Sequence, residues 1–403
     1  MQHVLLAPTP MQTNLHGKHP IIYGGISSCT ASAACLGRNS TATASTQPFT
    51  TPLLVGPLAT ALLRCVHAAS RTWWLSYRFH HPRRSTSPLC APMEWHHHRR
   101  TDPTTGCFTS CNFSAMTLPM TQTETVPCPY CKSTRATQVR QSADIVKCTS
   151  CQTVYLRTRL TDQALYALYQ HYAHEGSHMR LPKTSEEIAT SGLRRTEFVA
   201  EALEFVTPGG IWLDVGCGWG AMLDHVRERG FVPRGIELTR SCVDFATMVL
   251  GIPVSNSDLL ESAILPESCS VISMVHVLEH LTQPAEALRK VHVTLNSGGL
   301  YAGIVPNFDS LCSELLMDGW AWLDPHYHYV HYTPSTLRAH LQAAGFDVLR
   351  IYTATGDYGA DVVLGYIKSV VHQLPESVRY EDLLRAVEAD GRGEEIRFFA
   401  RKR

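Results

Sequence analysis

The 403-residue sequence lacks an excess of either charge, since 35 lysine and arginine residues balance 35 aspartate and glutamate residues. A chain whose main task is to bind a nucleic-acid backbone or an anionic membrane usually carries a strong positive excess. The balance therefore argues against a nucleic-acid partner and against membrane attachment, and it favours a small or neutral partner. With 44% hydrophobic residues, the chain can form a sizeable core, which excludes disorder throughout.

Long hydrophobic runs are also missing from the N-terminal part. The apolar run at 53–63 is interrupted by Gly56 and Pro57 and ends at Arg64, whereas a membrane-spanning helix needs about 20 apolar residues. The N-terminus also lacks a basic segment followed by an apolar one, which argues against a secretory signal. We therefore expect neither a transmembrane helix nor secretion, and we predict a cytoplasmic protein.

Acidic residues are almost absent from residues 1–116, where Glu94 and Asp102 are the only two. This segment is rich in Thr, Ser, Pro and His and has no sustained period of 2 or 3.6 residues, so we predict a disordered leader. It is alternatively an organelle transit segment, or the product of a start upstream of the real one, because Met116 and Met120 stand just before the first organised sequence. Composition favours the early start over the transit segment.

Fourteen cysteines are scattered along the chain, unlike the dense disulfide framework of a small secreted protein. Four of them have the spacing C-x2-C-x16-C-x2-C, namely Cys128, Cys131, Cys148 and Cys151. Two thiolates separated by two residues on a tight turn can converge on one side of a tetrahedral ion, and a second pair completes the site. The spacing predicts structural Zn²⁺, with redox chemistry of a single pair as the alternative.

The residues between the two cysteine pairs, 136–147, have the alternation of a short hairpin. Hairpin and cysteines together predict a zinc ribbon over residues 117–158, which is too small to form a core without its ion. Because all four ligands are cysteines, no coordination position stays open for catalysis. A helical connector is expected over residues 159–206. Its apolar stripe comprises Leu165, Tyr166, Leu168, Tyr169 and Tyr172.

From residue 207 the sequence alternates between strand and helix patterns. Strands are expected at 211–215, 232–238, 252–255, 270–275 and 300–305, and helices at 221–229, 240–250, 284–295 and 335–344. Such a βαβ series predicts a parallel sheet covered by helices on both faces. Two later runs, 346–352 and 395–401, predict a hairpin at the sheet edge. Ligands of these sheets bind beyond the carboxyl ends of the strands.

The first expected strand runs directly into a glycine-rich loop, Asp-Val-Gly-Cys-Gly-Trp-Gly at 214–220. Glycines permit a tight turn there and let a ligand approach the backbone. Glu237, at the end of the second strand, is placed to accept hydrogen bonds from ribose hydroxyls. The loop and the carboxylate together predict a nucleoside-containing ligand.

The spacing of Gly216, Gly218 and Ala221 also fits a permissive dinucleotide fingerprint, so an NAD-dependent oxidoreductase is an alternative. Asp214 argues against it, because a carboxylate repels a pyrophosphate and suits a positively charged ligand. Asp258, after the third strand, can hold an adenine amino group. The predicted edge hairpin is a third feature that disfavours NAD.

Residues 211–403 resemble class I S-adenosylmethionine-dependent methyltransferases. Beside the loop at 214–220, the resemblance rests on Gly-Ile-Glu at 235–237, His-Val-Leu-Glu-His-Leu at 276–281 and the run from Gly298 to Asn307. A ribbon followed by this domain is similar to a subgroup with an N-terminal zinc ribbon. The resemblance implies a Rossmann-like α/β fold, with a seven-stranded, mostly parallel sheet and an antiparallel last strand, in a methyltransferase domain over residues 207–403.

The resemblance also implies S-adenosylmethionine as the cofactor. It places Asp214 and the loop glycines at the methionine part, Glu237 on the ribose, Asp258 and Leu259 at the adenine and His276 beside the cofactor. The implied cofactor residues are Asp214, Gly216, Gly218, Gly220, Glu237, Asp258, Leu259 and His276. Cys217, between two of the glycines, is interpreted as a small buried thiol because no partner for a nucleophile is evident.

Methyl transfer needs a general base only where the acceptor must lose a proton. The candidates are His280 and His328, and the alternative for Glu279-His280 is a helix start that supports the active-site loop. Sugar C-methyltransferases that resemble this domain have Glu-His where this sequence has Tyr327-His328, which disfavours C-methylation. Trp320 and Trp322 either line the substrate site or pack a cap over the sheet.

We therefore predict a class I methyltransferase that acts on a small-molecule acceptor by O- or N-methylation. The alternatives are the NAD-dependent oxidoreductase and a zinc-ribbon adaptor with a non-catalytic nucleotide-binding core. The intact glycines and acidic residues at 214–237 disfavour the adaptor.

Overall fold

A computed structural model of the chain describes residues 122–403, except 141–142, 166–180, 194–195 and 371–378. The predicted leader at 1–116 lies outside the described residues, and so does most of the predicted connector stripe. None of the helices in the described part of the chain has both the length and the apolar character needed to span a bilayer.

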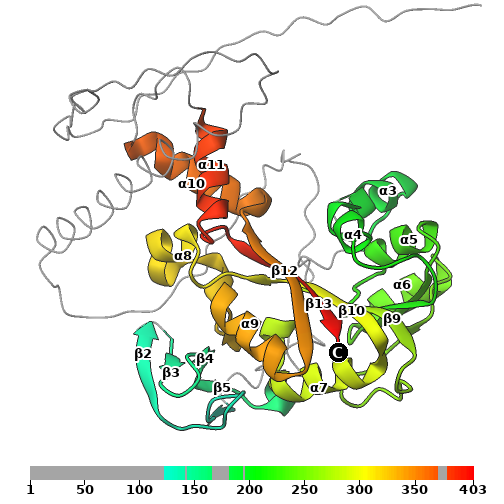
Figure 1. Cartoon of the computed structure of the whole chain (residues 1–403), viewed down its shortest axis with the longest axis horizontal. Coiled ribbons are helices and arrows are strands. Elements are labelled where there is room, and N and C mark those ends of the chain that lie inside the picture. Colours follow the sequence, from blue (N-terminus) through cyan, green and yellow to red (C-terminus); the bar gives the residue numbers. More distant parts are fainter. Residues whose placement is uncertain (1–121, 141–142, 166–180, 194–195, 371–378) are drawn as a thin grey trace, which may run out of the picture. The chain divides into compact units, whose positions relative to one another are not determined.

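A seven-stranded sheet forms the centre of the fold, in the order β12-β13-β10-β9-β6-β7-β8 (Figure 1). Its strands are β6 (Ile211–Val215), β7 (Val232–Ile236), β8 (Val254–Ser255), β9 (Cys269–Val275), β10 (Leu295–Pro306), β12 (Phe346–Ala354) and β13 (Glu395–Lys402). β13 runs antiparallel to β10 and β12, whereas the pairs from β10 to β8 are parallel. The predicted sheet with an antiparallel last strand is confirmed.

The direction of strand order changes at β6, because β7 and β8 follow on one side of it and β9 pairs on the other. In open α/β sheets such a switch point opens a crevice at the carboxyl ends of the strands, where ligands bind. The glycine-rich loop follows β6 directly and therefore lies in this crevice.

Alternating residues of the strands face two helical layers. Trp212 packs in one apolar core with α4 (Thr196–Ala202) and α5 (Ala221–Glu228). Leu213, the next residue, packs in the opposite core with α7 (Pro284–Thr294) and α9 (Pro334–Ala343). The remaining helices of this region are α3 (Ser185–Leu193), which contacts α5, and α6 (Arg240–Met248), which contacts β8.

Two helices separate β12 from β13, where the sequence analysis expected a direct hairpin. They are α10 (Gly356–Val370) and α11 (Tyr380–Ala389), and with α8 (Leu311–Leu316) they share a third apolar core. Leu383 and Val387 of α11 are buried at helical i,i+4 spacing. The two edge strands still pair in antiparallel register from Phe346–Lys402 to Ala354–Glu395.

The cysteine segment forms a second, four-stranded sheet, in the order β11-β4-β3-β2. Its strands are β2 (Ala136–Arg140), β3 (Ile145–Cys148), β4 (Val154–Leu156) and β11 (Val330–His331), and beside it β1 (Thr123–Thr125) pairs with β5 (Thr158–Leu160). The expected hairpin is present as β2 and β3. Its fourth strand, β11, comes from the histidine-aromatic run that lies about 180 residues further along the chain.

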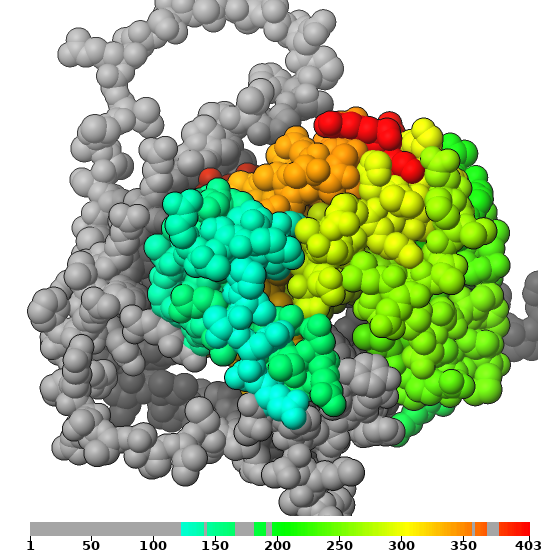
Figure 2. Space-filling view, turned by 90° about the horizontal axis from the view of Figure 1, so that it is seen from below, coloured from blue at the N-terminus to red at the C-terminus, as the bar shows by residue number. Residues whose placement is uncertain are grey.

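The described part of the predicted ribbon, residues 122–158, also contacts α9 through side chains. The ring of Tyr130 stacks on His340 with centroids 3.4 Å apart, and its hydroxyl lies 2.9 Å from that of Tyr332. Thr153 Oγ1 lies 2.8 Å from Nε2 of His340. In Figure 2 the cyan and teal ribbon lies against the yellow and orange segments of the surface. The ribbon and the segment around β11 are therefore parts of one packed body.

Candidate functional site

The glycine-rich loop after β6 has a conformation that favours glycine. Gly216, Gly218 and Gly220 have φ angles of 69°, 55° and 91°, which lie in the left-handed region. A Cβ on Gly216 would also lie 2.5 Å from Cγ2 of Val277. Gly216 is therefore required both by backbone conformation and by space.

Glu237 joins this loop to the end of β7. Its buried carboxylate accepts a hydrogen bond from the Gly218 N–H at 2.9 Å and another from the Thr239 N–H at 2.8 Å. The amide of Asn256 donates to the carbonyl of Glu237 and so fixes the strand end. A carboxylate has about four lone-pair positions, so Glu237 can accept further bonds from two ribose hydroxyls.

Asp214 is the last charged residue before the glycines, and its carboxylate is only 4% exposed. Its Oδ1 accepts a hydrogen bond of 2.7 Å from the Ser273 hydroxyl, which in turn accepts one of 2.8 Å from the Trp212 indole N–H. These two hydrogen bonds in series hold the Asp214 carboxylate at the switch point of the sheet. A buried negative charge there stabilises a positively charged ligand group.

Asp258 and Leu259 follow β8, in the position that the resemblance implies for adenine. Asp258 Oδ1 accepts a hydrogen bond of 2.7 Å from the Leu260 N–H, which closes a local turn. The side chain of Leu259 is buried in the same apolar core as Ile236 of β7. The loop is thus anchored beside the end of β7.

His276 follows β9 with a left-handed φ of 54°, an uncommon conformation for a residue other than glycine. Its Nδ1 lies 3.4 Å from Glu279 Oε1 and its Nε2 lies 3.3 Å from Glu395 Oε1. Its ring stacks on Trp322 with centroids 4.8 Å apart. Burial lowers the pKa of His276, but the two carboxylates outweigh that effect and raise it to about 9. His276 is therefore an imidazolium at neutral pH.

The two candidate bases, His280 and His328, lie against each other with ring centroids 4.7 Å apart. Nδ1 of His280 is 3.0 Å from the carbonyl oxygen of Tyr327, and Nδ1 of His328 is 2.7 Å from that of Trp322. A carbonyl only accepts, so each Nδ1 carries the proton. Burial lowers the pKa of His280 to about 4 against the opposing effect of Glu279, so this ring is neutral at pH 7.

Glu279 lies between these histidines with 1% of its surface exposed. Burial raises its pKa, but the contact with His276 and the neighbouring histidines outweigh that effect and lower it. Neither carboxylate oxygen accepts a well-aligned hydrogen bond from the described residues. His331 Nε2, also buried, likewise has no such partner in the described part of the chain.

The two tryptophans have different surroundings. Trp320 is buried and donates its indole N–H to Glu394 at 2.7 Å, as expected of a cap residue. Trp322 instead stacks between His276 and His328, at 4.8 and 5.9 Å. Trp322 therefore faces the histidine cluster.

The four cysteines of the ribbon converge. All four sulfur atoms lie within 4.8 Å of one another. Each pair is followed by a residue in left-handed conformation, Lys132 or Gln152, whose N–H donates to the carbonyl of the first cysteine of its pair at 2.9 or 3.0 Å. Hydrogen bonds from neighbouring backbone N–H groups outweigh burial and lower the pKa of Cys148 to about 7. The donor set and the paired turns fit a tetrahedral metal ion.

Cys217 is buried, and burial raises its thiol pKa well above the ordinary value. This agrees with its interpretation as a small packing residue.

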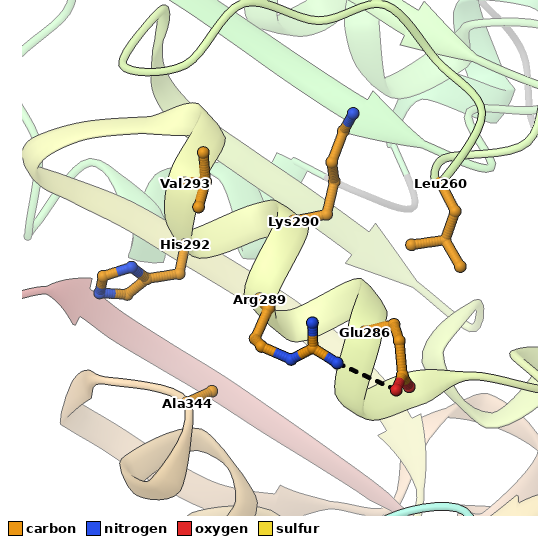
Figure 3. Close-up of a pocket in the computed structure, with 7 residues that line it drawn as sticks. All are labelled: Leu260, Glu286, Arg289, Lys290, His292, Val293 and Ala344. Atoms are coloured by element: carbon orange, nitrogen blue, oxygen red, sulfur yellow. Dashed lines mark hydrogen bonds and ion pairs between the residues drawn. The ribbon is translucent and has the colours of Figure 1, made fainter.

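A separate pocket of about 450 Å³ lies along α7 (Figure 3). Two of its cationic groups are already engaged, because Arg289 pairs with Glu286 at 2.9 Å and Lys290 donates to the Ser262 carbonyl at 2.8 Å. The pocket is lined by Leu260, Glu286, Arg289, Lys290, His292, Val293 and Ala344. It contains none of the predicted site residues.

The sequence of residues 189–351 matches the family model of a methyltransferase domain. The chain contains a class I S-adenosylmethionine-dependent methyltransferase domain. Its seven-stranded sheet with an antiparallel last strand and its glycine-rich loop after the central strand are those that the resemblance implied for this domain.

Curated relatives match part of the methyltransferase domain. A ubiquinone biosynthesis O-methyltransferase of Ralstonia nicotianae is 28% identical over 93 residues, which are 22% of this chain and 39% of that protein. One of Pseudomonas entomophila is 27% identical over 93 residues, 22% of this chain and 40% of that protein. The chain thus spans about two fifths of the length of these relatives.

Solved structures similar to this chain include an S-adenosylmethionine-dependent methyltransferase from Archaeoglobus fulgidus, with 20% identity, a TM-score of 0.39, and coverage of 53% of this chain and 94% of that one. Another from Mesorhizobium loti has 17% identity and a TM-score of 0.39, and the match covers 53% of this chain and 99% of that one.

The sequence analysis did not identify Glu395 and His331 as site residues of the methyltransferase domain. Glu395 begins β13, and because β13 is antiparallel, its first residue lies at the carboxyl end of β10. The predicted antiparallel direction of the last strand could therefore have identified Glu395 as a site residue. His331 stands in the histidine-aromatic run, but its approach to Glu279 depends on the pairing of β11 with β4.

Proposed function

We propose that the chain transfers the methyl group of S-adenosylmethionine to an oxygen atom of a small-molecule acceptor. The proposal rests on one arrangement, the Glu237 carboxylate held beneath the glycine-rich loop with Asp214 buried beside it. The proposed cofactor residues are Asp214, Gly216, Gly218, Gly220, Glu237, Asp258, Leu259 and His276.

The protein has little covalent chemistry to perform. The acceptor oxygen forms a bond to the methyl carbon, the carbon–sulfur bond breaks, and its electron pair stays on sulfur, which leaves neutral S-adenosylhomocysteine. The positive charge of the cofactor disappears in this step, so orientation of the two reactants at about 3 to 3.5 Å supplies much of the acceleration. A hydroxyl acceptor must also lose its proton.

His328 and His280 are the proposed groups that take this proton. Both carry a proton on Nδ1, so Nε2 bears the lone pair in the neutral ring. The names of the curated relatives support oxygen as the methylated atom, with nitrogen as the alternative. Incubation of the full chain with labelled S-adenosylmethionine and panels of small phenols, alcohols and amines tests this choice. Label that enters only amines would contradict the proposal.

Replacing Glu237 by alanine is expected to weaken S-adenosylhomocysteine binding roughly tenfold or more. The substitution leaves two ribose hydroxyls and the N–H groups of Gly218 and Thr239 without their acceptor, at a cost of about 1 to 3 kcal/mol. Isothermal titration calorimetry measures the affinity, with NAD as the negative ligand. The exposed Glu228 on α5 provides the matched control, since Glu228→Ala removes the same charge away from the loop. Equal affinities in both variants would contradict the assignment.

Replacing His328 by alanine is expected to lower kcat at least about tenfold and to leave the affinity for S-adenosylhomocysteine within twofold, because His328 is proposed to act on the acceptor and not to bind the cofactor. Release of S-adenosylhomocysteine with an identified acceptor measures kcat, and calorimetry measures cofactor affinity. His326→Ala, which changes an exposed histidine of the same run, is the control. Parallel loss of cofactor binding would show that the histidine supports the fold instead.

We also propose that Cys128, Cys131, Cys148 and Cys151 bind structural Zn²⁺. Burial of Cys128 and Cys148 and the two matching turns support a site formed for an ion. The ion would tie β2 and β3 together, since the ribbon has few buried apolar residues of its own. The ribbon (117–158), the connector (159–206) and the methyltransferase domain (207–403) are proposed to form the successive parts of the chain.

A further inference from the structure

A second cluster of potential metal ligands, apart from the cysteines, contains the two histidines that are proposed to act on the acceptor. Glu279, His280 and His328 each offer one ligand atom, and these atoms lie within 4.8 Å of one another. Glu279 and His280 belong to the short 3₁₀ helix η1 (Leu278–His280) after β9, whereas His328 comes from the run that leads into β11. The β11–β4 pairing and the Tyr329 N–H bond to the Glu279 carbonyl, at 2.8 Å, hold the two segments together.

Backbone contacts orient both histidine rings. The Nδ1–H of His280 points to the Tyr327 carbonyl and that of His328 to the Trp322 carbonyl. Each neutral ring then has its lone pair on Nε2. A hydrogen bond from the other ring nitrogen to a carbonyl is the usual support of a metal-binding histidine, because it fixes both tautomer and orientation.

Glu279 supplies a second, independent observation. Its carboxylate is 1% exposed and receives no well-aligned hydrogen bond from the described residues. His276 lies 3.4 Å from the Glu279 carboxylate but also lies 3.3 Å from Glu395. It therefore balances the negative charge of Glu279 only in part. A buried carboxylate without full compensation is costly, and a bound cation would remove that cost.

We propose that Glu279, His280 and His328 bind one divalent transition-metal ion on the acceptor side. Two imidazoles and one carboxylate suit Zn²⁺, Fe²⁺ or Co²⁺ better than Mg²⁺ or Ca²⁺, which prefer oxygen ligands. Ligand atoms of one tetrahedral ion lie roughly 3.4 Å apart for bonds of about 2.1 Å. Small side-chain rotations therefore close the site from its present spacing.

With three protein ligands, the ion would keep coordination positions open for oxygen ligands. These open positions indicate the class of acceptor. This step rests on the proposed function but replaces its base: with Nε2 of His280 and His328 on the ion, neither ring could take the proton. A hydroxyl bound to the ion would instead lose its proton to solvent more readily, and its oxygen would then accept the methyl group. The acceptor would be a compound with a hydroxyl able to coordinate a metal, whereas a simple amine would gain nothing from the ion.

The test measures zinc in the full-length chain after equilibrium dialysis against Zn²⁺ and removal of excess. Two zinc ions per chain are expected for the wild type and for the control His326→Ala. Glu279→Gln, which keeps the shape of the side chain, and His328→Ala are expected to keep one. Because loss of the ribbon zinc would also release β11 and His328, the cluster variants and not Cys131→Ser assign the second ion.

One zinc in the wild type that Glu279→Gln and His328→Ala both retain, or two in both of these variants, would overturn the metal site. Thermal unfolding and calorimetry with S-adenosylhomocysteine on the same samples show whether the variants are folded. Calorimetry also separates the two proposals. Cofactor binding with a zinc content that neither cluster variant lowers would remove the metal site and keep the proposed function. Two zinc ions in the wild type without cofactor binding would do the reverse.

Discussion

Replacing Gly216 by alanine is expected to weaken S-adenosylhomocysteine binding about 100-fold. The new Cβ would lie 2.5 Å from Cγ2 of Val277, and the residue has a φ of 69°. Overpacking of this kind costs about 1 to 3 kcal/mol, and the left-handed conformation adds about 1 to 2 kcal/mol. The loop must move to relieve both, and it would no longer match the cofactor. Calorimetry measures the affinity, and thermal unfolding measures the stability.

Two further variants separate the clash from the backbone strain. Gly251 has a similar φ of 66° but open space around it. Gly251→Ala should therefore lower the free energy of unfolding through backbone strain and leave the cofactor affinity unchanged. Adding Val277→Ala to Gly216→Ala removes the atom that clashes and should recover at least about tenfold of the lost affinity. If the double variant binds no better than Gly216→Ala, the contact with Val277 does not explain the loss.

Replacing Cys131 by serine is expected to remove the proposed zinc from the ribbon and to lower methyl transfer at least about 100-fold, with cofactor affinity kept within twofold. Structural zinc contributes about 10 to 16 kcal/mol to the folding of small metal domains, so the ribbon should unfold without it. β4 would then no longer pair with β11, which positions His331 and its neighbours. Elemental analysis, turnover and calorimetry measure the three quantities.

The control for this variant uses a cysteine of opposite environment. Cys131 is exposed, so its replacement removes little packing, whereas Cys269 of β9 is buried. Cys269→Ala should therefore cost some stability but keep the ion and the activity. A Cys131→Ser protein that retains stoichiometric zinc, or full turnover without it, would contradict the proposed role of the ribbon.

The parts of the fold that were predictable are those with local signals. β6 has the predicted bounds, and α5, α7 and α9 end within one residue of the expected positions. Period, glycine stops and prolines at helix starts determine these elements locally. The sequence analysis did not predict α10 and α11, although Leu383 and Val387 of α11 have the i,i+4 spacing of a helix.

The histidine cluster of the proposed acceptor site depends on contacts between distant segments. His276 meets Glu395 because β13 runs antiparallel beside β10. The contact of His328 with Glu279 depends on the β11–β4 pairing and on the Tyr329 N–H bond to the Glu279 carbonyl. The spacing of residues in the sequence does not indicate such contacts. The cofactor loop, by contrast, lies within a short stretch that ends at Glu237, so the sequence analysis could propose it residue by residue.

Strand β11 of the methyltransferase domain pairs with the ribbon, and this limits how segments of homologous proteins can be exchanged. β11 completes the ribbon sheet, and Tyr130 stacks on His340 of α9 across the same contact. A chimera that takes the ribbon from one homologue and the segment 325–343 from another would break the register of this sheet. Exchange of acceptor preference between homologues would therefore require the two segments to be transplanted as a pair, although residues 159–324 separate them in sequence.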